Sequence, residues 1–303
     1  MGRIAEALRK AQTEKAGRST LGIGPAWAQA GLAAEAGEPG LDAHRPGRRS
    51  MGFKSERSAP VIDPPDQASD VHMPPPFWDV HPTIMTVRER SSPITEQYRA
   101  ARTWLLRRSA PSGKNCVAVT SSVAREGKSV TTANLAAIMA EVRHMKVLAI
   151  DCDIRQGSLA RLFRISNEPG ISEVMAGRAT LASAIQTTPL GNLFVLPAGE
   201  CHDINSTELL NSTAASTMFA QIRDRFDYVL VDTPPVQCLS DVGVIGALCT
   251  GLILVVRMNK TPAHLVRQSA HWLQANNLNI LGCIAADCSA RGARYEYDVN
   301  GGD

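Results

Sequence analysis

From about residue 93 onward, short apolar runs alternate with longer segments in which apolar residues recur at helical spacing. The apolar runs predict strands at 116–121, 146–153, 192–199, 227–235, 251–257 and 278–287. Predicted helices lie at 94–108, 129–142, 206–225 and 262–276. Because uninterrupted Val, Ile and Leu strands separated by helices are typical of strands buried on both faces, we expect an α/β fold, with a mostly parallel sheet flanked by helices on both faces.

The first quarter of the chain lacks this alternation. Eleven of the 18 prolines lie between Gly17 and Pro93, and residues 17–82 are otherwise rich in Gly, Ala, Ser and charges. Such a composition buries too little apolar surface to order a chain, so we predict a flexible linker over 17–82. The folded domain is then expected at 83–290, with a flexible tail at 291–303.

Residues 1–16 form a candidate amphipathic helix before this linker. Ile4, Leu8 and Ala11 recur at helical spacing among basic residues. So narrow an apolar stripe cannot hold a helix alone in water. Two interpretations stay open: a helix that docks on a partner or a membrane surface, and a frayed chain end.

Charge and apolar content narrow the class of protein. The 32 Lys and Arg residues against 29 Asp and Glu give a net charge of +3, which excludes a strongly basic nucleic-acid coat, and we expect no nucleic-acid partner. No stretch approaches the ~18 apolar residues that span a bilayer, and no apolar segment follows the N-terminus, so neither a membrane span nor a secretory signal is expected. The seven cysteines include no CxxC pair, and we expect buried thiols.

A glycine-lysine-serine turn follows the first predicted strand and opens a helix. In this context backbone N–H groups and the helix N-terminus hold phosphate oxygens. Lys128 is expected to reach the β- and γ-phosphates, and the Ser129 hydroxyl is expected on Mg²⁺. The candidate nucleotide-binding residues are Ala124, Arg125, Glu126, Gly127, Lys128, Ser129 and Val130. The alternative is an ordinary helix N-terminus that Ser129 caps.

Carboxylates end two of the predicted strands. Asp151 and Asp153 end one strand and precede Arg155, and Asp232 ends another. Carboxylates two positions apart on an extended chain point the same way, and a divalent cation is the usual means of offsetting their repulsion. A solvated acidic loop is the alternative for this pair. Asp232 stands in the place of a Walker B carboxylate, which holds Mg²⁺ directly or through water.

Together these motifs resemble the bacterial tyrosine kinases (BY-kinases), the cytoplasmic autokinases of capsule and exopolysaccharide synthesis. The resemblance rests on SSVAREGKS at 121–129, LAIDCDIR at 148–155 and VLVDTPP at 229–235, and covers about residues 80–290. It implies a P-loop NTPase of the deviant Walker type, related to MinD and ParA ATPases. The N-terminal MGRIAEALRKAQ also resembles the start of stand-alone members that pair with a separate membrane protein.

The resemblance implies roles for named residues. ATP and Mg²⁺ would be the cofactors, with Lys128, Asp151, Asp153 and Asp232 as catalytic residues and Ser129, Asp151 and Asp232 as Mg²⁺ ligands. Either Asp151 or Asp153 would be the base that orients a tyrosine hydroxyl. Arg155 would stabilise phosphate charge.

A second set of implied roles concerns assembly. Glu96, Arg99 and Arg102 fit ExxRxxR, which in this family lies at the subunit interface of a homo-oligomeric ring. An ordinary salt-bridged helix turn is the alternative. Tyr295 and Tyr297 in the tail would be the phosphoacceptors. A membrane polysaccharide co-polymerase would be the activating partner, and would recruit the cytoplasmic chain to the inner face of the plasma membrane.

The chain departs from the family pattern at two places. In the phosphate turn, Arg125 stands where the family has a glycine with greater backbone freedom. At the end of the last strand, Ala286 stands where the family has Asn. Two other functions therefore stay open. One is a MinD- or ParA-like assembly ATPase switched by ATP, and the other is a nucleotide-binding scaffold of the polysaccharide machinery.

Overall fold

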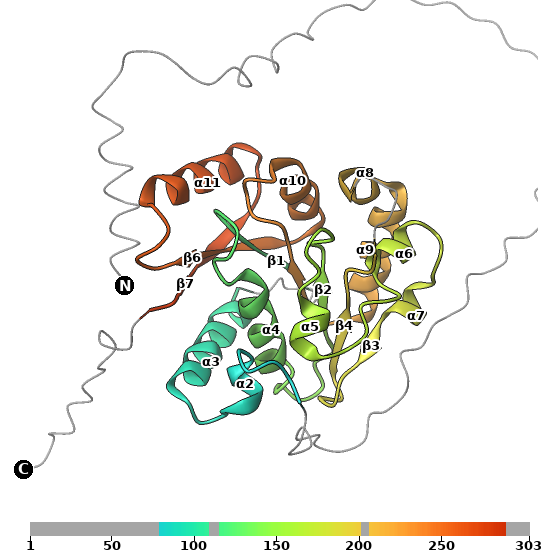
Figure 1. Ribbon diagram of the computed structural model, residues 1–303, viewed down its shortest axis with the longest axis horizontal. Coiled ribbons are helices and arrows are strands. Elements are labelled where there is room, and N and C mark those ends of the chain that lie inside the picture. Colours follow the sequence, from blue (N-terminus) through green and yellow to red (C-terminus); the bar gives the residue numbers. More distant parts are fainter. Residues whose placement is uncertain (1–78, 109–114, 201–205, 289–303) are drawn as a thin grey trace, which may run out of the picture. The chain divides into compact units, whose positions relative to one another are not determined.

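The computed structural model describes residues 79–108, 115–200 and 206–288 (Figure 1). All of them belong to the compact unit Pro60–Asp303. The predicted N-terminal helix, nearly all of the predicted linker and the tail with Tyr295 and Tyr297 lie outside the described residues.

Seven strands form one sheet in the order β3-β4-β2-β5-β1-β6-β7. All neighbouring strands are parallel except β3 and β4. The strands are β1 (Asn115–Ser121), β2 (Val147–Asp151), β3 (Gln186–Thr187), β4 (Leu193–Leu196), β5 (Tyr228–Asp232), β6 (Gly251–Arg257) and β7 (Ile280–Ala286). The six predicted strands and their parallel pairing are confirmed, and the five that lie inside the sheet are the buried apolar runs.

Helices cover both faces of this sheet (Figure 1), as predicted. One face packs against α2 (Met85–Arg88), α3 (Pro93–Leu106), α4 (Lys128–Met139) and α5 (Leu159–Phe163). The other packs against α6 (Ile171–Met175), α7 (Leu181–Ala184), α8 (Ser206–Leu210), α9 (Thr213–Arg225), α10 (Leu239–Leu248) and α11 (Ala263–Ala275). Because alternate residues of one strand point to opposite faces, Leu148 and Ala149 belong to different cores.

Two local predictions need correction. The single helix expected at 206–225 is two helices, because the Ser212 hydroxyl accepts the N–H of Ala215 at 3.2 Å and starts α9 afresh. The thiols of Cys283 and Cys288 are exposed rather than buried, since β7 is an edge strand of the sheet and Cys288 follows it.

Packing also reaches into the end of the predicted linker. Val80 is fully buried in the core, and the N–H of His81 donates to the carbonyl of Leu162 at 2.9 Å. The ordered chain therefore includes a few residues before the predicted domain start at 83. No helix in the described ranges is long and apolar enough to cross a membrane.

Candidate active site

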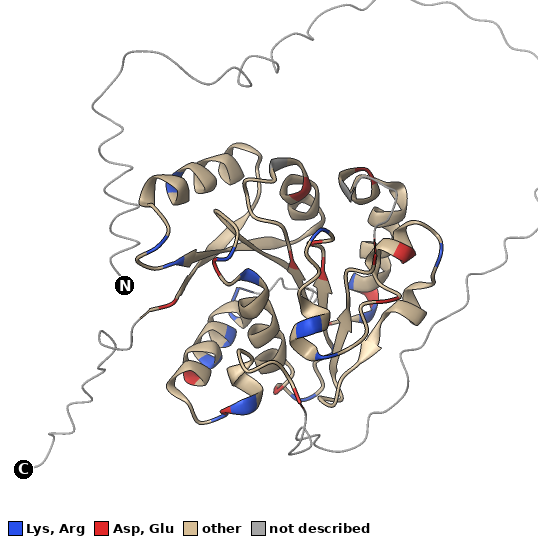
Figure 2. Cartoon of the chain, in the orientation of Figure 1, with Lys and Arg blue, Asp and Glu red and all other residues tan. Residues whose placement is uncertain are grey.

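The candidate site lies where the three central strands end. β1, β5 and β2 are neighbours, and they end at Ser121, Asp232 and Asp151. Their register sets Asp232 between Val119 of β1 and Asp151 of β2. Acidic residues, red in Figure 2, therefore gather at the carboxyl edge of the sheet. This edge is the usual ligand site of an open parallel sheet.

The phosphate loop joins β1 to α4. Gly127, the residue before α4, has a φ of 94°, and Arg125 has a φ of 65°. Glycine adopts this left-handed conformation freely, whereas Arg125 carries a cost of about 1 kcal/mol. In the described part of the chain no side chain caps α4, so its first N–H groups are open to an anion. The alternative interpretation, an ordinary helix N-terminus that Ser129 caps, is therefore not supported.

Two of the acidic residues are already partly satisfied within the protein. Asp151 is fully buried and accepts the N–H groups of Asp153 at 3.2 Å and Leu159 at 2.8 Å. Burial and, to a lesser degree, the charge of Asp153 raise the pKa of Asp151 to about 6. Asp153 lies 3.4 Å from the Lys128 ammonium, and both side chains are buried. The predicted repulsion between the two carboxylates is therefore offset partly by Lys128 and partly by backbone donors.

Asp232 differs from both. It is 0% exposed, and among the described residues neither of its carboxylate oxygens has a hydrogen-bond partner. Burial and, to a lesser degree, the charge of Asp151 raise the pKa of Asp232 well above its usual value. The charge of Lys128 and the Ser129 hydroxyl lower this pKa by smaller amounts. A buried carboxylate without partners is costly, and a cation offsets that cost.

The donors at this edge fit a magnesium–nucleotide complex. We use the name strand-end cluster for Lys128, Asp151, Asp153 and Asp232. No group of three or more acidic, His or Cys side chains that could hold a metal alone occurs in the described ranges. Mg²⁺ commonly takes one or two carboxylates and completes its shell with substrate phosphates and water. The unpartnered oxygens of Asp232 beside an open helix N-terminus supply such an incomplete site.

Arg155, the predicted phosphate contact, lies at the rim of the site. Its side chain is 60% exposed, and its guanidinium lies 3.8 Å from the buried carboxylate of Asp241 in α10. Asp241 also accepts the hydroxyl of Thr207 in α8. Asp241 could not be singled out from its sequence context, because an aspartate in the first turn of a helix is ordinary. Its burial beside Arg155 is what marks it as part of the site.

Arg99 and Arg102 both bind the carboxylate of Glu141, which follows α4, at 3.1 and 3.0 Å. Arg99 also pairs with the exposed Glu96, and Arg102 donates to the carbonyl of Ile138 at 2.8 Å. We use the name Glu141 network for Glu96, Arg99, Arg102 and Glu141. The arginines therefore tie α3 to α4 within one chain, and their predicted role at a subunit interface stays a prediction.

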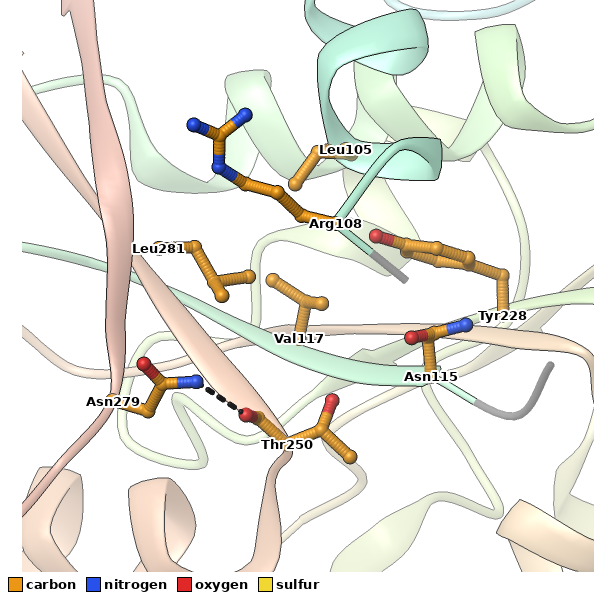
Figure 3. A pocket seen from close by; sticks show the side chains of 8 residues that line it. All are labelled: Leu105, Arg108, Asn115, Val117, Tyr228, Thr250, Asn279 and Leu281. Atoms are coloured by element: carbon orange, nitrogen blue, oxygen red, sulfur yellow. Dashed lines mark hydrogen bonds between the residues drawn. The ribbon is translucent and has the colours of Figure 1, made fainter. Parts of the chain in front are cut away.

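A separate cavity of about 230 Å³ lies at the opposite, amino edge of the sheet. Leu105, Val117, Tyr228 and Leu281 form its apolar walls, and Asn279 donates to the carbonyl of Thr250 at 3.0 Å beside it (Figure 3). None of the predicted site residues lines this cavity. The candidate chemistry is therefore confined to the carboxyl edge.

A mostly parallel sheet with a phosphate loop between β1 and α4 and acidic strand ends defines the class: a P-loop nucleotide-binding protein. A family model described as an AAA domain matches residues 116–261. The tyrosine-protein kinase YwqD of Bacillus subtilis is 30% identical over 201 residues, which cover 66% of this chain and 84% of that protein. The chain belongs to the family of bacterial tyrosine-protein kinases.

Other relatives are similar to this chain over only part of their own length. The tyrosine-protein kinase wzc of Salmonella typhi is 30% identical over 213 residues, but these are 70% of this chain and only 29% of that protein. The solved kinase domain of Escherichia coli tyrosine kinase ETK superposes with a TM-score of 0.63 at 31% identity, covering 68% of this chain and 82% of the other. The BceF tyrosine kinase domain superposes with a TM-score of 0.61 at 28% identity, covering 67% and 81%.

Proposed function

We propose that the chain is an ATP-dependent protein-tyrosine autokinase that phosphorylates a second copy of itself and so regulates exopolysaccharide or capsule polymerisation and export. The observation that carries the proposal is Asp232, a fully buried carboxylate without a hydrogen-bond partner among the described residues, beside the open N-terminus of α4. Family membership supports tyrosine as the acceptor.

ATP and Mg²⁺ are the proposed cofactors, and the residues divide the task of holding them. The loop from Ala124 to Val130 offers backbone N–H groups to phosphate oxygens, and Lys128 adds its ammonium. Ser129, Asp151 and Asp232 supply oxygen ligands for the cation, which when bound neutralises developing phosphate charge. Phosphoryl transfer needs mainly alignment and charge neutralisation, and this edge of the sheet provides both.

Asp153 is the better of the two candidates for the base that orients the tyrosine hydroxyl. Both oxygens of the fully buried Asp151 already accept backbone N–H groups. Asp153 instead contacts Lys128 at 3.4 Å, a long contact that separates easily when the ammonium turns to phosphate. Its carboxylate is then free to accept the proton that a tyrosine hydroxyl loses late in the reaction.

The remaining parts of the proposal rest on the resemblance to the family. Tyr295 and Tyr297 would be the phosphoacceptors, and the Glu96, Arg99 and Arg102 face of α3 would contact a neighbouring subunit in a ring. A membrane polysaccharide co-polymerase would activate the kinase and hold it, as a cytoplasmic protein, at the inner face of the plasma membrane. No nucleic-acid partner is proposed.

Phosphosite mapping tests the function. Purified full chain is incubated with ATP and Mg²⁺, with and without the cytosolic segment of the co-polymerase, and phosphotyrosine is located by mass spectrometry. We expect phosphate on Tyr295, Tyr297 or both, which a Lys128→Met variant fails to acquire. Steady ATP hydrolysis without phosphotyrosine in either condition would contradict the proposal and favour a MinD- or ParA-like assembly ATPase. Full cellular function of Lys128→Met would favour a scaffold.

A further inference from the structure

Glu126 lies inside the phosphate loop, and its side chain is buried and hydrogen-bonded within the protein. It is only 2% exposed, whereas its neighbour Arg125 is exposed. The Oε2 atom of Glu126 accepts the N–H of Val123 at 2.8 Å, three residues earlier in the same loop. The loop is therefore closed upon itself by a carboxylate, and Glu126 offers a ligand its backbone rather than its side chain.

The other oxygen of Glu126 reaches a different part of the chain. Its Oε1 atom accepts the hydroxyl of Thr261 and, at 3.4 Å, the N–H of Arg257. Arg257 is the last residue of β6, and Thr261 lies in the connection between β6 and α11. A hydrogen bond to a charged group is stronger than a neutral one, and a buried carboxylate with three donors is well satisfied. This carboxylate thus fastens the phosphate loop to a segment more than 130 residues away in sequence.

The same connection also reaches the end of β7. The Arg257 guanidinium donates to the carboxylate of Asp287 at 2.9 Å. A Cβ atom added at Gly127 would lie 3.9 Å from the Cβ of Ala286, in ordinary contact. The loop therefore lies against the ends of β6 and β7, and Glu126 supplies its direct hydrogen bonds to the β6–α11 connection.

Loop shape matters here because the left-handed conformations of Arg125 and Gly127 flank Glu126. A loop folded this tightly around a non-glycine left-handed residue needs fixed contacts to persist. We propose that Glu126 is a positioning residue that holds the phosphate loop in its nucleotide-binding shape, with the Thr261 hydroxyl as its anchor on the β6–α11 connection. The inference rests on nucleotide binding within the proposed function, and does not require tyrosine as the acceptor.

Binding of a fluorescent ADP analogue in the presence of Mg²⁺ tests this role in the full chain. We expect Glu126→Ala to bind the analogue about 10- to 100-fold more weakly, since the loop loses all three hydrogen bonds of the carboxylate. Glu126→Gln keeps one acceptor oxygen and should lose less. The pair Thr261→Val and Thr261→Ser isolates the hydroxyl: valine matches threonine in shape, while serine keeps the donor. We expect about 3- to 10-fold weaker binding for valine and near wild-type binding for serine.

Controls separate positioning from loss of fold. Melting temperature is measured for every variant, and Glu89→Gln removes an exposed carboxylate just after α2 as a matched change of charge. Support requires that affinity falls in Glu126→Ala while the melting temperature stays within a few degrees of wild type, and that valine binds more weakly than serine at position 261. If Glu126→Ala does not fold, the position-261 pair decides.

Several outcomes would overturn the inference. These are wild-type affinity, within twofold, in both Glu126→Ala and Thr261→Val; equal losses in Thr261→Val and Thr261→Ser; and no nucleotide binding by the wild type. Failure of the proposed function looks different. Wild type that binds the analogue but forms no phosphotyrosine would end the kinase proposal and leave the role of Glu126 supported or refuted by the same titration.

Discussion

The strand-end cluster and the Glu141 network are both built from acidic and basic side chains, but they differ in burial and in charge balance. The strand-end cluster sets three carboxylates against one ammonium, and all four side chains are buried. The Glu141 network sets two guanidiniums against two carboxylates, keeps partial contact with solvent, and pairs every member. One cluster is therefore left with excess negative charge, while the other is balanced.

This difference separates a binding site from a structural contact. A balanced network at the surface needs nothing further, and contributes modestly to stability because solvent screens it. An unbalanced buried cluster costs free energy that the bound magnesium–nucleotide complex would recover. Asp232 shows that cost most clearly, since it is fully buried and neither of its oxygens makes a hydrogen bond of ordinary geometry in the described part of the chain.

The largest effect is expected from Asp232→Asn. Loss of a cation ligand should lower autophosphorylation by about 10³-fold or more. The same change removes a buried charge, and should raise the free energy of unfolding of the nucleotide-free protein at pH 8 by ~1–3 kcal/mol. Urea unfolding and a phosphotyrosine assay measure the two effects. A variant that is both inactive and less stable than wild type would show that Asp232 is structural.

The next effect is a pH dependence set by Asp151. Its pKa in the folded protein, about 6, lies above the unfolded value of 3.8, so its contribution to stability is full below pH 3.8 and is lost as pH rises through about 6. Affinity for Mg²⁺ and ADP should change in the opposite direction and rise over the same interval, because a metal needs the ionised carboxylate.

Calorimetric titration between about pH 4 and pH 7, with unfolding measured in parallel, checks both trends. Asp151→Asn is the control, and it should flatten the stability profile over this interval. Affinity that does not change with pH in the wild type would contradict an Asp151 that must lose a proton to bind.

The smallest effect is expected in the Glu141 network. Glu141→Gln weakens the ion pairs with Arg99 and Arg102, and should lower the free energy of unfolding by about 1 kcal/mol. Nucleotide affinity should stay within twofold of wild type, since the site is separate. Glu89→Gln serves as the surface control. A loss of nucleotide binding comparable to that of Asp232→Asn would erase the distinction between the two clusters.

Much of the fold was predictable because buried parallel strands appear as continuous apolar runs. The short helices at 159–184 were not predicted, since fewer than two turns leave no readable period. The break between α8 and α9 was also missed, because Ser212 reads equally well as a helix residue or as a cap.

The site residues from the phosphate loop and the strand ends were predictable because a motif and a strand end fix their place together. The inward turn of Glu126 was not, because its partners lie 131 and 135 residues away along the chain. Glu141 was missed for the same reason: its partner Arg99 is 42 residues earlier. Contacts between distant segments depend on packing, which local pattern does not report.

The most direct test mixes two variant chains, one without the phosphate-binding lysine and one without the acceptor tyrosines. Lys128→Met keeps both tail tyrosines but lacks the phosphate-binding lysine, and a Tyr295→Phe, Tyr297→Phe double variant keeps the site but lacks the acceptors. Neither should acquire tail phosphotyrosine alone with ATP and Mg²⁺. Mixed, the two should place phosphate on Tyr295 or Tyr297 of the Lys128→Met chain, identified by mass. Phosphotyrosine on Lys128→Met incubated alone would contradict the assignment of the strand-end cluster. A mixture without tail phosphotyrosine, beside wild type that acquires it, would contradict transfer between chains.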